Sequence, residues 1–123
     1  MTSPQYTCPC CGYLTFKEMP GSFDICPICF WEDDAVQLMD PWFAGGANKP
    51  NLVEAQQTFA RTGAMEARFA TQVRGVQASD ERDVTWRPAS ASDRMRIRTP
   101  ASLSDSESLD IGAWYYWRRD IVQ

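Results

Sequence analysis

The sequence contains no histidine, and this absence removes several classes of enzyme chemistry. Without an imidazole, the chain has no histidine general base, no Ser-His-Asp or Cys-His nucleophile system, and no mixed Cys/His catalytic zinc site. No P-loop or G-x-G-x-x-G motif occurs, and the dipeptide Gly45-Gly46 is too short to act as a phosphate-binding loop. We therefore expect that the protein is not an enzyme.

Long apolar runs are also missing. Charged residues interrupt every apolar stretch before it reaches the ~18 residues that a transmembrane helix needs. The N-terminal sequence MTSPQYTCPC has no basic n-region and no apolar h-region, so it does not resemble a signal peptide. These absences predict a cytoplasmic protein with no membrane partner.

Arginine is absent from the first 60 residues, which carry two lysines and seven acids, whereas residues 61–123 carry ten arginines and nine acids. The whole chain has a net charge of −4. The acidic first half would repel a phosphate backbone and attract a basic protein. Nucleic acid is therefore an unfavourable partner, and a protein partner is expected.

The chain has five cysteines, and four of them form two C-x-x-C pairs, Cys8 with Cys11 and Cys26 with Cys29. Because no secretory feature accompanies them, this spacing indicates a metal site and not a disulfide framework. Two facing knuckles would surround one structural Zn²⁺ with four thiolates, and a rubredoxin-like iron centre is the alternative. The fifth, Cys10, is either a reactive thiol or, as we prefer, a small residue packed in the turn.

The order of local signals predicts an α+β fold, in which a small zinc-ribbon or rubredoxin-like hairpin packs on two or three helices. Residues 12–17 favour strand and residues 19–22 favour a turn, so two short strands are expected between the cysteine pairs. Residues 32–51 are expected to be mostly loop. We interpret the chain as a single domain over 1–123, with a zinc-ribbon lobe at 6–34, a helical part at 51–78 and a C-terminal part of unknown role at 79–123.

The clearest helix signal begins at Asn51, which together with Glu54 forms a capping-box pattern. Leu52 and the apolar residues that follow it share one helical face, and Gly63 is a C-terminal stop. A second helix is expected over about 64–76.

Two strands are predicted in the C-terminal part, at 84–87 and at 94–98, where polar and apolar residues alternate. A last helix is expected after a cap at residues 104–107. It would continue through Trp114, Trp117 and Ile121, which fit helical spacing, although the aromatic run 114–117 is also compatible with a strand.

An aromatic and acidic run, Phe30-Trp31-Glu32-Asp33-Asp34, follows the second cysteine pair. The aromatic pair either covers the metal site, which we prefer, or belongs to a recognition surface. The acids are either a solvated charge run or a contact for a basic partner. The candidate partner-binding residues are Glu32, Asp33, Asp34, Arg96, Trp114 and Tyr115.

Three segments together, CPCCGYLTF, ICPICFWEDD and GGANKPNLVEAQQTFARTGA, resemble the cysteine-rich CPCC domain family of bacterial proteins. The resemblance covers roughly residues 6–64. It implies a zinc-ribbon-like N-terminal lobe with Cys8, Cys11, Cys26 and Cys29 as ligands, and it implies no settled activity.

Protein binding is the function that these observations favour. The chain carries five Trp, four Tyr and six Phe, and aromatic residues concentrate in recognition surfaces. A more specific hypothesis is an immunity protein that neutralises a cognate bacterial toxin. The alternatives are a rubredoxin-like electron carrier and a nucleic-acid-associated zinc-ribbon protein. The nucleic-acid hypothesis depends on a basic strip beside aromatic side chains that could stack on bases. These residues are Arg94, Arg96 and Arg98 with Trp86, Tyr115 and Trp117.

Overall fold

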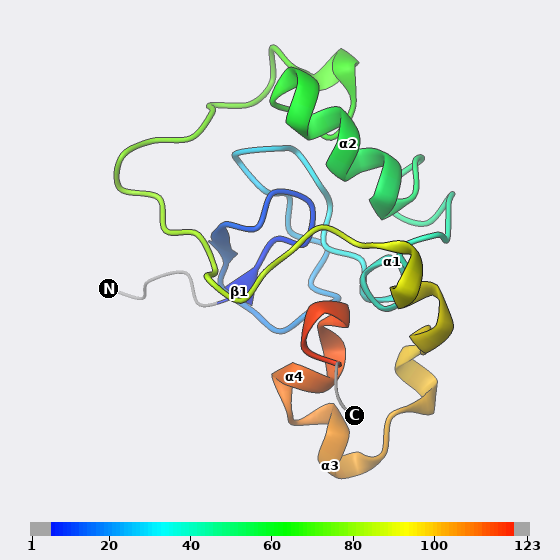
Figure 1. The fold of residues 1–123 in the computed structure, drawn as a ribbon. Helices are drawn as coiled ribbons and strands as arrows, with labels where there is room; N and C mark the ends of the chain where they lie inside the picture. The colour runs from blue at the N-terminus through cyan, green and yellow to red at the C-terminus, as the bar shows by residue number, and fades with distance from the viewer. Residues whose placement is uncertain (1–5, 120–123) are drawn as a thin grey trace.

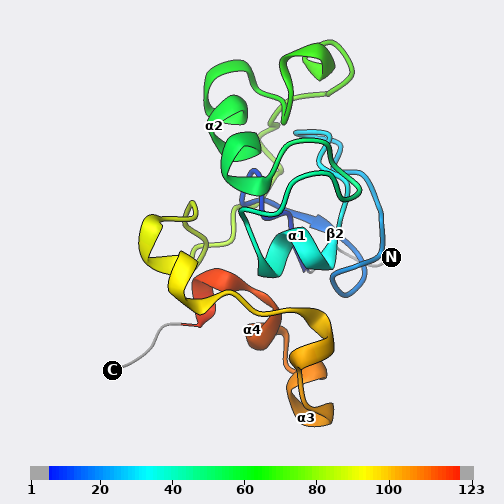
Figure 2. The ribbon, with the colours of Figure 1, turned by 90° about the vertical axis from the view of Figure 1, so that its right-hand side faces the viewer.

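The computed structural model describes residues 6–119; residues 1–5 and 120–123, and with them the predicted helical position of Ile121, lie outside the described part. The chain combines a two-stranded antiparallel hairpin with short helices, as an α+β fold requires. In Figures 1 and 2 the N-terminal hairpin lies between helix α2 (Leu52–Thr62) on one side and the C-terminal helices on the other.

The hairpin differs from the prediction in its position. Strand β1 (Tyr6–Thr7) pairs with β2 (Leu14–Phe16), so the two strands flank the first cysteine pair and do not lie between the two pairs. Around the second pair a single antiparallel bridge joins Ile25 and Glu32. Each C-x-x-C segment is therefore the turn that connects two antiparallel stretches of chain.

A short helix, α1 (Ala35–Met39), occupies part of the region that the sequence predicted to be mostly loop. The Asp34 side chain accepts two backbone N–H groups of its first turn, at 2.8 and 3.1 Å. Leu38 and Met39 are buried, so the helix closes the core. The prediction failed because Asp34 was interpreted as one of a run of surface acids and not as an N-cap.

Helix α2 confirms its prediction. Asn51 accepts the Glu54 N–H at 2.8 Å, and the Glu54 carboxylate accepts the Asn51 N–H at 3.2 Å. Gly63 ends the helix with a left-handed φ of 84°. Leu52 and Ala55 are fully buried, so the amphipathic face points into the core.

The predicted second helix over 64–76 is wrong, because only a single 3₁₀ turn, η1 (Ala67–Phe69), forms there. The Met65 N–H donates to the Cys29 carbonyl at 2.7 Å, and the Arg74 N–H donates to the Pro27 carbonyl at 3.1 Å. In a helix over 64–76 the Arg74 N–H would donate to a carbonyl of the preceding turn, so its bond to Pro27 competes with the helical ladder. The Met65 N–H would lie in the first turn, where it has no helical acceptor, and its bond to Cys29 fixes the segment against the second knuckle.

The strands predicted at 84–87 and 94–98 are also wrong. The first region is turn and loop, and the second overlaps a 3₁₀ helix, η2 (Ala91–Arg96). The Asp93 carboxylate accepts the Ser90 N–H at 2.8 Å and both Arg87 guanidinium nitrogens at 2.7 Å, which fixes the first turn. Met95 is 89% exposed, so the alternation of residue types did not reflect a buried face.

The C-terminal region consists of single turns and not of one long helix. They are η3 (Pro100–Ser102), α3 (Asp105–Ser108), α4 (Ile111–Trp114) and η4 (Tyr116–Arg118). The predicted cap is confirmed, since Ser104 and Glu107 form a capping box at the start of α3. No helix in residues 6–119 is both long enough and apolar enough to cross a bilayer.

The core joins the two ends of the chain. The Tyr115 hydroxyl accepts the Thr7 N–H at 2.9 Å, and the Tyr115 ring stacks on Trp117 at 4.2 Å between centroids. Trp31 is fully buried in the same cluster. The C-terminal turns thus pack directly on the hairpin that carries the cysteines.

Candidate metal centre

The sulfur atoms of Cys8, Cys11, Cys26 and Cys29 lie within 4.8 Å of one another. The Cys8 and Cys29 sulfurs are 3.5 Å apart, and those of Cys11 and Cys26 are 3.8 Å apart. A tetrahedral ion with metal–sulfur bonds of about 2.3 Å requires sulfur separations of about 3.8 Å. All four side chains have 0% exposure, so the arrangement fits a buried Cys₄ metal site.

The first knuckle is closed by two backbone hydrogen bonds. The Cys8 N–H donates to the Tyr13 carbonyl at 2.9 Å, and the Gly12 N–H donates to the Cys8 carbonyl at 2.8 Å. Gly12 has φ +82°, the left-handed conformation expected for the residue after the pair. A Cβ at this position would lie 2.6 Å from the Trp86 ring, so the glycine also allows the indole to approach.

The second knuckle repeats this geometry. The Cys26 N–H donates to the Trp31 carbonyl at 2.9 Å, and the Phe30 N–H donates to the Cys26 carbonyl at 2.8 Å. Phe30 occupies the position that Gly12 holds in the first knuckle, and it has φ +75°. Left-handed backbone costs a residue with a Cβ about 1–2 kcal/mol. The Phe30 ring packs against Phe69 at 4.5 Å, which offsets that cost.

The carbonyl groups of both knuckles are held by distant parts of the chain. The Pro9 carbonyl accepts the Gln56 Nε2–H and the Trp86 Nε1–H, both at 2.9 Å. The Cys11 carbonyl accepts from Arg82 at 3.1 Å, while Met65 holds the Cys29 carbonyl. Helix α2 and the loop after it therefore fix the orientation of the sulfur ligands.

The electrostatics of the cluster favour a cation at its centre. Burial raises the pKa of the Cys8 and Cys29 thiols well above the ordinary value. Burial acts on Cys26 in the same direction, but hydrogen bonds from the other thiols and from Thr15 outweigh it, so the Cys26 pKa lies well below the ordinary value. The Thr15 hydroxyl donates to the Cys26 sulfur at 3.3 Å. A metal ion would stabilise all four thiolates and release the remaining protons.

Cys10 lies outside the tetrad. It is 1% exposed and occupies the position in the first knuckle that the fully buried Ile28 occupies in the second. Burial raises its pKa, and a hydrogen bond with the Cys29 thiol partly opposes that effect. The geometry agrees with the preferred interpretation of Cys10 as a small residue packed in the turn.

Three of the predicted partner-binding residues are buried, so the prediction is corrected for them. Asp33 is 2% exposed and accepts the Ser22 hydroxyl at 2.7 Å. Asp34 is 8% exposed, and besides capping α1 it accepts the Ala47 N–H at 2.8 Å. Tyr115 is a core residue. These side chains stabilise the fold and are not available to a partner.

The other candidate partner residues have different surroundings. Glu32 and Trp114 are half-buried, and the Trp114 indole donates to the Ser108 carbonyl at 3.1 Å. Arg96 is exposed. The structure does not bring Glu32 together with the C-terminal candidates, because Glu32 lines a small pocket with Phe30 and Asn48.

The aromatic surface of the nucleic-acid hypothesis does not form. Tyr115 and Trp117 are 2% and 3% exposed, and the Trp86 ring is turned toward Gly12. Arg94 lies over the Trp42 ring at 5.3 Å and Arg98 pairs with Glu107, so the predicted basic strip is divided. The buried rings cannot stack on bases.

Sequence reasoning missed the residues that support the ligands. Gln56 and Thr15 carry no local signal, since their roles depend on contacts across the fold. Phe30 was expected to cover the metal site, but its left-handed conformation was not, although CPCCGY and CPICFW align residue by residue and this repeat pairs Gly12 with Phe30.

Two knuckles that bring four buried sulfurs together define a Cys₄ metal-binding protein. The family model described as cysteine-rich CPCC matches residues 6–80, and the chain belongs to this family. No curated protein matches the chain.

Proposed function

We propose that the chain is a binding protein whose four cysteines hold one structural Zn²⁺ and that it has no catalytic activity of its own. The complete burial of the tetrad supports this proposal most directly. A closed Cys₄ site keeps no open coordination position for a substrate, so the ion organises the fold. The zinc-ribbon-like assignment of the lobe, 6–34, belongs to the same proposal.

Zinc is proposed over iron because the two short knuckles and their hairpin are typical of zinc-ribbon sites. The donor set itself suits both metals. Elemental analysis and native mass spectrometry of the purified protein should give one equivalent of zinc. One equivalent of iron with a red colour would replace this proposal with the rubredoxin-like electron carrier.

The proposed ligand of the protein is another protein. An apolar groove of about 330 Å³ separates α2 from the segment 82–89. Val53, Phe59, Trp86 and Pro88 are among the residues that line it. Apolar clefts with a few polar groups are the usual anchor points for aromatic and aliphatic side chains of a partner.

The specific partner that we propose is a bacterial toxin, so that the chain acts as a cytoplasmic immunity protein. The immunity role is supported by the small size of the chain, by its acidity and by its resemblance to small bacterial proteins. Co-expression with the product of the adjacent gene should give a stable complex and protect cells from its toxicity. Failure of both complex formation and protection would overturn the immunity proposal.

Two variants test the groove in that complex. Val53→Glu places a charge in the groove, whereas Val84→Glu makes the same change at a residue that is 97% exposed and lies outside it. The first variant should weaken the complex by at least tenfold, and the second should leave it unchanged. Equal behaviour of the two variants would show that the partner binds elsewhere.

A further inference from the structure

A second cleft, of about 510 Å³, lies among η2, α4 and the C-terminal turn. It shares no lining residue with the apolar groove or the cysteine tetrad. Four arginines and two acids contribute to its wall, so the cleft is basic although the whole chain is acidic. The charged residues of the lining are Arg96, Arg98, Glu107, Asp110, Arg118 and Arg119.

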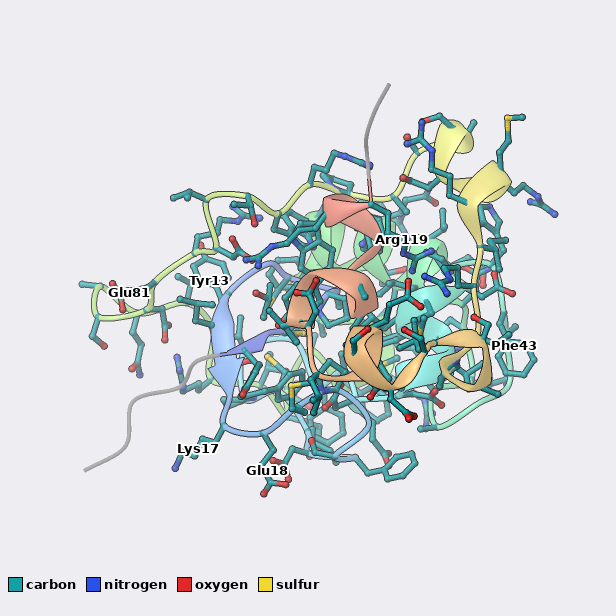
Figure 3. All side chains as sticks on the ribbon, turned by 90° about the horizontal axis from the view of Figure 1, so that it is seen from below. Tyr13, Lys17, Glu18, Phe43, Glu81 and Arg119 are labelled. Atoms are coloured by element: carbon teal, nitrogen blue, oxygen red, sulfur yellow. The ribbon has the colours of Figure 1, made fainter. Side chains whose placement is uncertain are left out.

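Arg119 is the unusual member of this group. Its guanidinium donates to two neutral carbonyl groups, that of Arg96 and, at 3.2 Å, that of Met39. Within residues 6–119, no carboxylate forms an ion pair with it. Its Nε–H is buried and has no acceptor in the described part of the chain. Figure 3 labels Arg119 beside the C-terminal turn, and its bond to the Met39 carbonyl connects that turn to α1.

A buried charge is costly where no counter-ion offsets it, none is present for Arg119 among residues 6–119, and the pKa of Arg119 reflects this cost. Burial and the nearby charge of Arg98 lower that pKa to about 10, with partial compensation from Asp93. An anion in the cleft would offset the repulsion between the Arg119 and Arg98 charges.

The other charged side chains of the cleft differ in how fully they are already paired. Glu107 is engaged by Arg98 through two hydrogen bonds at 2.8 and 3.1 Å. The Asp110 carboxylate caps α4 by accepting the Gly112 N–H at 3.0 Å. Arg118 lies over the Tyr115 ring, its Nε–H donates to the Thr85 hydroxyl at 3.3 Å, and its Nη2 is 3.7 Å from Asp83. Among residues 6–119 its Nη1 group has no partner and is the donor that remains for a ligand. Arg96 has an interaction of its own, and the proposal does not depend on it.

We propose that this cleft binds a small oxyanion, a phosphate or carboxylate group, with Arg119 as its anchor and Arg118 as its second donor. Guanidinium groups favour such ligands because their planar N–H pairs match two oxygen atoms at once. No aromatic ring lines the cleft, so its recognition is directed to the charged group and not to a base. The inference is independent of the proposed partner of the apolar groove.

The test follows the arginine Nε–Hε resonances of the full ¹⁵N-labelled chain by NMR. Inorganic phosphate and, separately, acetate are added at constant ionic strength. A saturable shift of the Arg119 and Arg118 signals with either anion supports the site, and the anion that binds identifies the source as phosphoryl or carboxylate. Unsaturated shifts of equal size at all arginines with both anions would overturn it.

Variants distinguish anion binding from a purely structural role of Arg119, whose hydrogen bonds connect α1 and η2. Arg118→Gln should weaken the anion by about tenfold, since one charged hydrogen bond is lost. Arg68→Gln removes the same charge from a side chain that is 65% exposed and paired with Glu66, and it should leave the affinity unchanged. Arg119→Lys keeps the charge and loses the planar fork, so it should also weaken binding. Unaltered affinity in both Arg118→Gln and Arg119→Lys would contradict the proposal.

Discussion

The two cysteine knuckles have the same backbone hydrogen bonds, and they differ in the residue at the left-handed position, which is Gly12 in the first and Phe30 in the second. Both residues adopt a left-handed conformation, with φ of +82° and +75°. In the first knuckle the missing Cβ makes room for Trp86, and in the second a large ring fills the space against Phe69. The same backbone conformation is thus reached once without strain and once with strain that packing offsets.

The comparison also explains how each knuckle is attached to the fold. The first is held mainly by side chains, those of Gln56, Trp86 and Arg82, together with one backbone donor, the Asp83 N–H, which bonds the Gly12 carbonyl at 2.8 Å. The second is held mainly by the backbone N–H groups of Met65 and Arg74, together with one side-chain donor, the Thr15 hydroxyl. We expect the first knuckle to be more sensitive to substitution, since a side-chain donor can be removed and a backbone donor cannot.

Metal removal should have the largest effect on stability, because the ligands of both knuckles would bind the same ion. Apparent binding free energies of structural zinc are about 10–16 kcal/mol, comparable to the ~5–15 kcal/mol that stabilises a whole domain. A strong chelator should therefore abolish the near-UV circular dichroism of Trp31 and the rest of the core. The same chelator saturated with zinc is the control. A native spectrum in a metal-free sample would show that the tetrad folds without an ion.

The substitution Gly12→Ala should have the next largest effect. It adds left-handed strain of about 1–2 kcal/mol and forces the Trp86 ring away from the 2.6 Å approach, for a total loss of about 2–4 kcal/mol. Gly63→Ala is the matched control, because Gly63 has φ +84° and no atom within 4 Å of a built Cβ. Chemical denaturation of the zinc-loaded proteins measures both. Equal losses would mean that Trp86 moves aside freely.

The sequence could predict those parts of the molecule that depend on short spacings. Cys8, Cys11, Cys26 and Cys29 form two local pairs, and a pair determines where its sulfurs point. Helix α2 was likewise predicted by its own ends, Asn51 and Gly63. These features need no knowledge of what lies on the other side of the fold.

The remainder depended on contacts between distant residues. The segment 64–76 has a helical pattern, but the N–H groups near its two ends, those of Met65 and Arg74, donate to the carbonyls of Cys29 and Pro27. From the sequence, Asp33 and Asp34 were interpreted as surface charges, but in the structure they are buried hydrogen-bond acceptors. In each case a long-range partner determined the structure, and a single sequence does not show which residues will meet.

Phe30 allows the strain of the second knuckle to be measured separately from its packing. Phe30→Ala and Phe30→Gly both remove the ring contact with Phe69, but only alanine retains a Cβ at φ +75°. The glycine variant should therefore be more stable than the alanine variant by about 1 kcal/mol, the reverse of their order in a helix. Thermal unfolding of the two proteins measures the difference. An alanine variant that is the more stable would show that the backbone leaves the left-handed region once the ring is gone.

The smallest effect is expected at Cys10, which has the position of Ile28 in the other knuckle. Its sulfur is buried outside the tetrad, so Cys10→Ser should keep one equivalent of metal and lose about 1 kcal/mol of stability from placing a hydroxyl in an apolar turn. Cys10→Ala, which removes the hydrogen bond with Cys29 but adds no polar atom, is the companion variant. Metal content and thermal unfolding are measured for both. Loss of the metal from either variant would make Cys10 a ligand, and the near-symmetry of the two knuckles would then not extend to their metal ligands.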